Sequence, residues 1–250
     1  MLVDVHAHLQ HNLFKKDIDE VIKRAKEANI VSIVNSGTSL EENKLCLQLS
    51  KKYAIVKSSF GMYPLDAIKL SEDDLQKEFD YIIKNKENII AIGEIGLDYS
   101  TNERISKQKE IFYRILELSE RLKKPIIVHS RKAEKDVLEI LETTKIKKAI
   151  MHCFTANMNL VNKASDLGFY FSIPPIITRL KHFQTLVEKI SLKQILTESD
   201  SPFLSPIKEK RNEPSYVGET IKVISQIKKL DRIEIENIIY MNYQNFFKKF

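Results

Sequence analysis

Eight short apolar runs recur along the 250-residue chain, and this repetition limits the possible folds more than any other feature of the sequence. The runs are rich in valine and isoleucine and have few polar positions, which is typical of parallel strands that are covered on both faces. We therefore expect eight strands, at residues 2–5, 30–34, 54–60, 89–92, 125–128, 148–151, 169–173 and 194–196.

The segments between these runs carry apolar residues at helical spacing. Ser71 and Asp74 have the spacing of a capping box, which marks the start of a helix. The helical pattern is clearest in five segments, at residues 17–29, 71–85, 107–123, 217–229 and 233–250. Strands and helices therefore alternate along the whole chain.

Eight repeats of strand and helix predict an α/β fold, a single (βα)₈ TIM barrel. An open doubly wound sheet is the alternative, and it would usually bind a nucleotide through a glycine-rich first turn. The first turn reads HAHLQHN and has no glycine, and no P-loop motif GxxxxGK[ST] occurs in the chain. Because no Pro/Gly/Ser-rich linker divides the chain, we expect residues 1–250 to form one domain, with residues 202–215 as a long final loop.

The composition excludes several classes of protein. Apolar residues make up 43% and charged residues 30% of the chain, which excludes collagen-like and disordered proteins. The two cysteines, Cys46 and Cys153, form no CxxC pair, so we expect no disulfide scaffold and a cytoplasmic location. We also expect no membrane span, because no apolar run is long enough, and no secretory signal, because no basic region followed by an apolar one begins the sequence. The net charge of +6 fits attraction to phosphate backbones, and it equally fits a solvated lysine-rich surface.

Potential metal ligands gather where the predicted strands end. In a barrel, functional side chains lie at the C-terminal ends of the strands. Five of these ends carry imidazoles or carboxylates, namely His6, His8, Glu94, His129, His152 and Asp200. Imidazole and carboxylate without thiolates suit Zn²⁺, Mn²⁺ or similar divalent ions. Each residue alone has an ordinary structural explanation, but their coincidence at five strand ends favours a metal centre.

The spacing of these residues predicts two cations. His6 and His8 are two residues apart on a strand, so they point to the same face and can hold one ion. His129 and His152 come from neighbouring strands and can hold a second ion, with Glu94 bridging the two. Asp200 enters from the last strand, beside the first. Paired cations about 3.5–4 Å apart are a recurring device for the hydrolysis of phosphoryl esters.

Six motifs along the chain together resemble the TatD family of metal-dependent deoxyribonucleases, which belongs to the amidohydrolase-type barrels. They read DVHAHL, GEIGLDY, KQKEIFYRILELSERLKKPIIVHSR, MHCFTAN, TESDSPFL and RNEPSYV, and they follow one another over essentially the whole chain. The resemblance implies two divalent ions (Mg²⁺, Mn²⁺ or Zn²⁺) and hydrolysis of DNA phosphodiesters, often from a 3′ end. It places one ion among His6, His8, Glu94 and Asp200, and the other among Glu94, His129 and His152.

The chain departs from the family pattern near the substrate. Family members usually carry Gly-x-His-Pro after the third strand, where this chain reads Gly-Met-Tyr63-Pro. A phenol does not titrate near neutral pH, since its pKa is about 10 against about 6.5 for imidazole, but it donates hydrogen bonds to phosphate. We expect Tyr63 and Arg131 to bind substrate, with Arg131 gripping a phosphate bidentately or forming a surface salt bridge to Glu134. Lys132, where many family members have an acid, adds positive charge near the site.

These observations lead to the hypothesis of a metal-dependent hydrolase of ester bonds, a TatD-like 3′–5′ exonuclease that acts on DNA ends or single strands. Asp200 is its general base and Glu94 its bridging catalytic carboxylate. Phe154, Tyr63 and Tyr99 offer a surface on which a terminal base can stack, or they pack in the core. We expect a monomer, and we interpret His11 and His182 as surface residues outside the site.

Two other functions remain open on the sequence. A D-aminoacyl-tRNA deacylase, or another ester or amide hydrolase, would use the same ligands for attack on a carbonyl. A non-enzymatic nucleic-acid-binding protein is the second alternative, and the full set of ligand-type residues argues against it.

Overall fold

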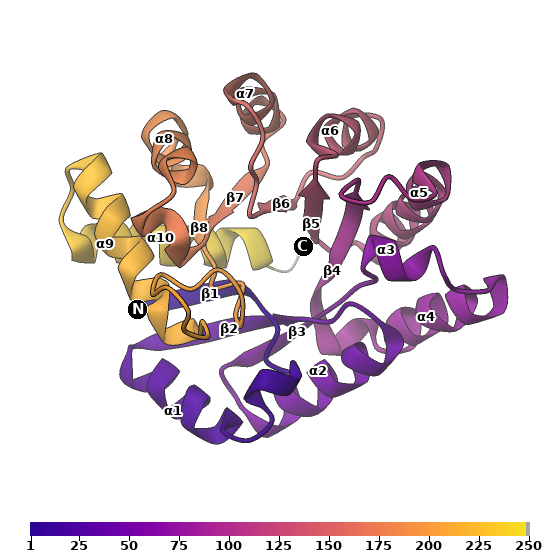
Figure 1. The fold of residues 1–250 in the computed structure, drawn as a ribbon, viewed down its shortest axis with the longest axis horizontal. Helices are drawn as coiled ribbons and strands as arrows, with labels where there is room; N and C mark the ends of the chain where they lie inside the picture. Colours follow the sequence, from indigo (N-terminus) through magenta and orange to yellow (C-terminus); the bar gives the residue numbers. More distant parts are fainter. Residues whose placement is uncertain (249–250) are drawn as a thin grey trace.

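Eight parallel strands form one sheet in the order β1 to β8 in the computed structural model, which describes residues 1–248. Most helices surround the ring of strands on its outside, and the last one, at Arg232–Phe247, passes behind it (Figure 1), so the predicted TIM barrel is confirmed. The strands are β1 (Leu2–Ala7), β2 (Ile30–Ser36), β3 (Val56–Phe60), β4 (Ile89–Asp98), β5 (Ile126–Arg131), β6 (Ala149–His152), β7 (Tyr170–Ile173) and β8 (Ile195–Thr197). Each lies at a predicted apolar run.

The α-helices follow the strands along the chain. They are α1 (Ile18–Glu27), α2 (Leu40–Lys52), α3 (Pro64–Ala67), α4 (Glu72–Lys84), α5 (Ile105–Leu122), α6 (Glu134–Glu142), α7 (Met158–Asp166), α8 (Lys181–Lys189), α9 (Val217–Lys228) and α10 (Arg232–Phe247). The predicted start of α4 is confirmed, since the Ser71 hydroxyl accepts a hydrogen bond from Asp74 N at 3.1 Å. The last two residues of the predicted helix 233–250 lie outside the described residues. None of the helices within residues 1–248 is long and apolar enough to cross a membrane.

The barrel is closed between β8 and β1 by contacts that continue past the end of β8. The Thr197 hydroxyl donates to the carbonyl of Val3 at 2.6 Å, and Asp200 N donates to the carbonyl of His6 at 2.9 Å. The loop that follows β8 is thereby fastened to the end of β1. This connection sets Asp200 beside the histidines of the first strand.

The inside of the barrel is filled by a layer of apolar side chains. On β5 and β6, Ile127 and Ile150 lie two residues before His129 and His152, so each pair faces the same side of its strand. The buried apolar cluster consists of Val5, Val34, Ala91, Ile127, Ile150, Leu196 and Phe246. Phe246 comes from α10, and its neighbours include Tyr170 at the start of β7, with ring centroids 5.0 Å apart. The ring of Phe246 therefore plugs the N-terminal end of the barrel, opposite the predicted ligands.

Replacement of this plug is expected to destabilise the fold. Phe246→Ala leaves a cavity beneath the apolar layer, and we expect the free energy of unfolding to fall by about 3–5 kcal/mol. Urea denaturation followed by circular dichroism measures this loss. The matched control is Met241→Ala in the same helix, where the side chain is 59% exposed and the expected change is within about 0.5 kcal/mol. Equal losses in the two variants would contradict the role of Phe246.

Candidate metal centre

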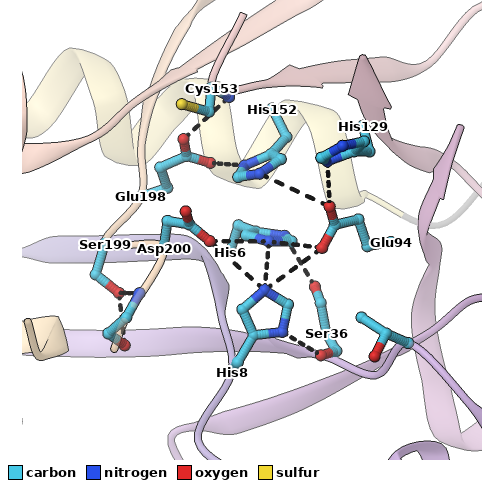
Figure 2. Close-up of polar contacts among 12 residues, drawn as sticks. His6, His8, Ser36, Glu94, His129, His152, Cys153, Glu198, Ser199 and Asp200 are labelled. Carbon is cyan, nitrogen blue, oxygen red and sulfur yellow. Dashed lines mark hydrogen bonds and ion pairs between the residues drawn. The ribbon is translucent and has the colours of Figure 1, made fainter. Parts of the chain in front are cut away.

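The six predicted ligand residues converge at the C-terminal end of the barrel (Figure 2). A cavity of about 540 Å³ opens over them, and its lining includes five of the six, namely His8, Glu94, His129, His152 and Asp200. His6, the sixth, is fully buried behind this lining. The prediction that these strand ends meet is therefore confirmed in the structure.

The first group of donor atoms comes from β1, β4 and the loop after β8. His6 Nε2 and His8 Nε2 lie 3.1 Å apart. Each of these nitrogens is 3.4 Å from Glu94 Oε2 and 3.5 Å from Asp200 Oδ1. A cation bonded to its ligands at about 2.0–2.2 Å keeps neighbouring donors roughly 3–3.5 Å apart. The separations among His6, His8 and Glu94 therefore fit a single divalent cation, and Asp200 also belongs to a set of potential ligands with His6 and His152.

The second group comes from β4, β5 and β6. Glu94 Oε1 is 2.6 Å from His129 Nδ1 and 3.9 Å from His152 Nε2, and the three ligand atoms form one potential metal site. A cation here would replace the close contact between Glu94 and His129, because two donors on one ion stand farther apart. Glu94 thus turns one oxygen to each group, which is the arrangement expected of a bridging carboxylate.

The outer nitrogens of the first two imidazoles are held by Ser36 at the end of β2. His8 Nδ1 lies 3.0 Å from the carbonyl oxygen of Ser36, and His6 Nδ1 lies 3.1 Å from its hydroxyl. Because a carbonyl only accepts, His8 Nδ1 carries a proton, and Nε2 is the nitrogen that would bind a cation. Ser36 therefore orients both rings.

The other two imidazoles are held by carboxylates. His152 Nδ1 is 2.7 Å from Glu198 Oε2, and His129 Nε2 is 3.2 Å from Asp98 Oδ2. A carboxylate on the outer nitrogen fixes the tautomer and the orientation of a ligand histidine. In both rings the remaining nitrogen faces Glu94.

Sequence reasoning did not assign a role to Ser36, Asp98 or Glu198. A signal for the two acids was present, because Asp98 lies four residues after Glu94 on β4 and Glu198 lies two residues after an inward-facing leucine of β8. Even separations keep side chains on one face of a strand. No comparable signal marks Ser36, whose role depends on the distance between two strands.

The buried carboxyl group of Asp4 also anchors the loop that carries Asp200. Asp4 Oδ1 accepts hydrogen bonds from Ser199 N at 2.8 Å and His6 N at 3.2 Å, and its Oδ2 accepts from the Ser199 hydroxyl at 2.6 Å. Burial raises the pKa of Asp4 to about 8, partly opposed by these hydrogen bonds. These hydrogen bonds fix the position of Ser199, the residue before Asp200, relative to the end of β1.

The electrostatics of the centre favour cations. Burial acts to raise the pKa of the Glu94 and Asp200 carboxyls, but the surrounding imidazoles outweigh it and hold both pKa values below the usual range. Burial lowers the pKa of His6 to about 4, so this ring is neutral and can act as a ligand. Burial acts to lower the pKa of His8, His129 and His152, but nearby carboxylates outweigh it and raise all three pKa values. A divalent ion would therefore take the place of protons that balance the two carboxylates.

The two predicted substrate residues differ in their placement. The Tyr63 hydroxyl donates to Asp98 Oδ2 at 2.5 Å, and its ring packs edge-on against His129. The hydroxyl therefore spends its hydrogen bond on the buried carboxylate, but Tyr63 still lines the cavity, and its contact with substrate stays a prediction. Arg131 lines the cavity with a side chain that is 61% exposed, and its ion pair is with Asp98 at 3.8 Å rather than with Glu134.

Two interpretations of the sequence need correction. His11 is half-buried and lines the cavity, because the chain after β1 turns along the rim. His182 is also half-buried, with Nε2 3.1 Å from the carbonyl of Phe154. Phe154 is only 1% exposed, so it packs in the core and cannot stack on a base.

Comparison with known proteins agrees with this geometry. The profile of the family described as TatD related DNase matches residues 3–248. A protein of Methanocaldococcus jannaschii named as an uncharacterized metal-dependent hydrolase is 39% identical over 99% of this chain and 97% of its own length. The human protein named deoxyribonuclease TATDN3 is 33% identical over 100% of this chain and 94% of its own.

A solved structure supports the barrel fold independently. YJJV, a TatD homologue from Escherichia coli K12, superimposes with a TM-score of 0.93 at 22% identity, covering 99% of this chain and 98% of its own. With the profile match over nearly the full length, these similarities establish the family. The chain belongs to the TatD family of metal-dependent hydrolases.

Proposed function

We propose that this protein hydrolyses phosphodiester bonds in DNA with two divalent cations held by the six converging residues. The observation that carries the proposal is the position of Glu94, whose two oxygens face separate groups of imidazoles. His6, His8 and Glu94 would hold one ion, with Asp200 beside both imidazoles as its fourth ligand, and Glu94, His129 and His152 would hold the other. Nitrogen and carboxylate donors suit Mg²⁺, Mn²⁺ or Zn²⁺ to different degrees. Bound cations of this kind supply an activated water and stabilise negative charge on phosphoryl oxygens.

Asp200 is the general base of the proposed reaction. Its Oδ1 faces His6 and His8, while its Oδ2 forms no hydrogen bond within residues 1–248. That oxygen is available to accept the proton of the attacking water as the water approaches phosphorus. The hydrogen bond of Asp200 N to the carbonyl of His6 keeps the carboxylate in place during this transfer.

The size of the cavity and the residues at its rim favour the end of a DNA strand as substrate. The cavity volume of about 540 Å³ lies within the range of sites for small ligands, roughly 300–1,000 Å³. A site of this size receives a terminal nucleotide more readily than a continuous duplex, which supports an exonuclease, and we propose that it acts in the 3′–5′ direction. The exposed guanidinium of Arg131 would grip a backbone phosphate, a contact that carries no sequence information.

Purified protein is expected to shorten single-stranded DNA when Mg²⁺ or Mn²⁺ is present, and EDTA is expected to stop it. Oligonucleotides labelled at either the 5′ or the 3′ end reveal the direction on a denaturing gel. Stepwise shortening of the 5′-labelled strand supports 3′–5′ action. Cleavage of D-aminoacyl-tRNA without any cleavage of DNA would replace this proposal with the deacylase alternative.

Asp200→Asn keeps an oxygen near the imidazoles but removes the proton acceptor. We expect kcat on single-stranded DNA to fall by about 10²–10⁴-fold, the usual contribution of a general base. His6→Ala should abolish activity through loss of a ligand. Asp73→Asn, an exposed position in α4, serves as the control and should leave kcat unchanged. If Asp200→Asn cleaves as fast as the unaltered chain, Asp200 is not the base.

Glu198→Gln tests the carboxylate that holds His152. Loss of such an outer partner weakens metal binding by about 10–100-fold, and isothermal titration with Mn²⁺ measures the change. Glu209→Gln, an exposed acid in the same loop, provides the matched control. Unchanged affinity in Glu198→Gln, with circular dichroism showing a retained fold, would mean that His152 does not hold a cation.

A further inference from the structure

We propose that Phe203 forms a binding subsite for an unpaired nucleobase at the rim of the metal cavity. This inference rests on the proposed function, because it assigns the substrate an unstacked base next to the phosphate that is cleaved. An aromatic ring binds any base through its π-face, so the subsite would select single-stranded or frayed DNA without reading its sequence.

Exposure separates Phe203 from the other aromatic residues considered near the site. Its side chain is 50% exposed although it lines the cavity. The hydroxyls of Tyr63 and Tyr99 donate to Asp98 and Asp136, and Phe154 is buried against Phe171. Phe203 is the only exposed residue among these four candidates, since Tyr63 and Tyr99 are half-buried, and exposed apolar surface of this kind is typical of a contact site.

Two contacts place the ring of Phe203 next to the candidate metal centre. Phe203 N donates to the carbonyl of Asp200 at 2.8 Å, which fixes its position relative to the proposed base. Its ring lies edge-to-face with His8, with centroids 6.1 Å apart. A base that stacks on Phe203 therefore lies beside the ligand group of the first cation, where its own phosphate can reach Asp200.

His11 adds a polar contact to the same subsite. Its ring packs against Phe203 at 5.5 Å between centroids and an interplanar angle of 79°. His11 Nδ1 accepts a hydrogen bond from Leu13 N at 3.2 Å, so the neutral ring carries its proton on Nε2. That N–H has no hydrogen-bond partner in the described part of the chain. It can donate to an oxygen or ring nitrogen of the base that Phe203 stacks against.

Binding measurements with two oligonucleotides test the subsite directly. One is a short single strand with normal bases, and the other carries abasic residues at its last two 3′ positions. We measure Kd by fluorescence anisotropy with Mn²⁺ present, in an Asp200→Asn background that prevents turnover. Phe203→Ala is expected to weaken binding of the normal strand by about 10- to 100-fold and to leave binding of the abasic strand unchanged.

Conservative and control variants separate stacking from support of the loop. Phe203→Trp keeps an aromatic face and should restore the affinity for the normal strand. Leu180→Ala, with 41% exposure outside the cavity lining, should affect neither strand. The proposal is overturned if Phe203→Ala weakens binding of both oligonucleotides equally or of neither. It is also overturned if the Asp200→Asn protein with Phe203 intact does not bind the normal strand.

The same series distinguishes this inference from the proposed function. If the unaltered chain fails to cleave DNA yet Phe203→Ala selectively weakens binding of the normal strand, the nuclease proposal fails and the base subsite stands. If the unaltered chain cleaves both oligonucleotides and Phe203→Ala slows both to the same extent, the nuclease proposal stands and the base subsite fails.

Discussion

A buried carboxylate, Glu94, lies at the point where the strand ends of the barrel converge. An ionised carboxylate in such a place costs several kcal/mol unless positive charge or hydrogen-bond donors surround it. Here four imidazoles from three strand ends and their loops provide that environment, two at each oxygen. The parallel barrel makes this possible, because it brings the C-terminal ends of all strands to one side.

The two halves of the centre have different surroundings. The Nδ1 atoms of His6 and His8 contact the hydroxyl and carbonyl of Ser36, which are neutral groups. His129 and His152 instead contact the carboxyl groups of Asp98 and Glu198. A histidine that donates to a carboxylate is a stronger base and a stronger ligand than one that donates to a carbonyl. The barrel thus places two unlike pairs of imidazoles on opposite oxygens of one side chain.

Several hydrogen bonds connect the loop after β8 to β1 and the residue that follows it. Asp4 accepts hydrogen bonds from Ser199, Asp200 N donates to the carbonyl of His6, and His8 N, directly after β1, donates to the carbonyl of Ser201. These contacts extend the closure of the barrel beyond the three residues of β8. The proposed base and the proposed base-stacking ring therefore share one anchored segment. The apolar layer below, plugged by Phe246, provides the rigid support that such a segment requires.

Local patterns in the sequence were enough to locate all eight strands and all six converging residues. Hydrophobic runs and period-two spacing are local patterns, and they locate the strands and the faces of their side chains. The parallel arrangement of the barrel then brings the C-terminal ends of the strands to one side. The tertiary structure alone decided which oxygen of Glu94 faces which imidazoles, that Ser36, Asp98 and Glu198 hold the rings, and that Tyr63 turns its hydroxyl inward while Phe203 stays exposed. These outcomes depend on distances between residues far apart in the chain, and no local pattern encodes such distances.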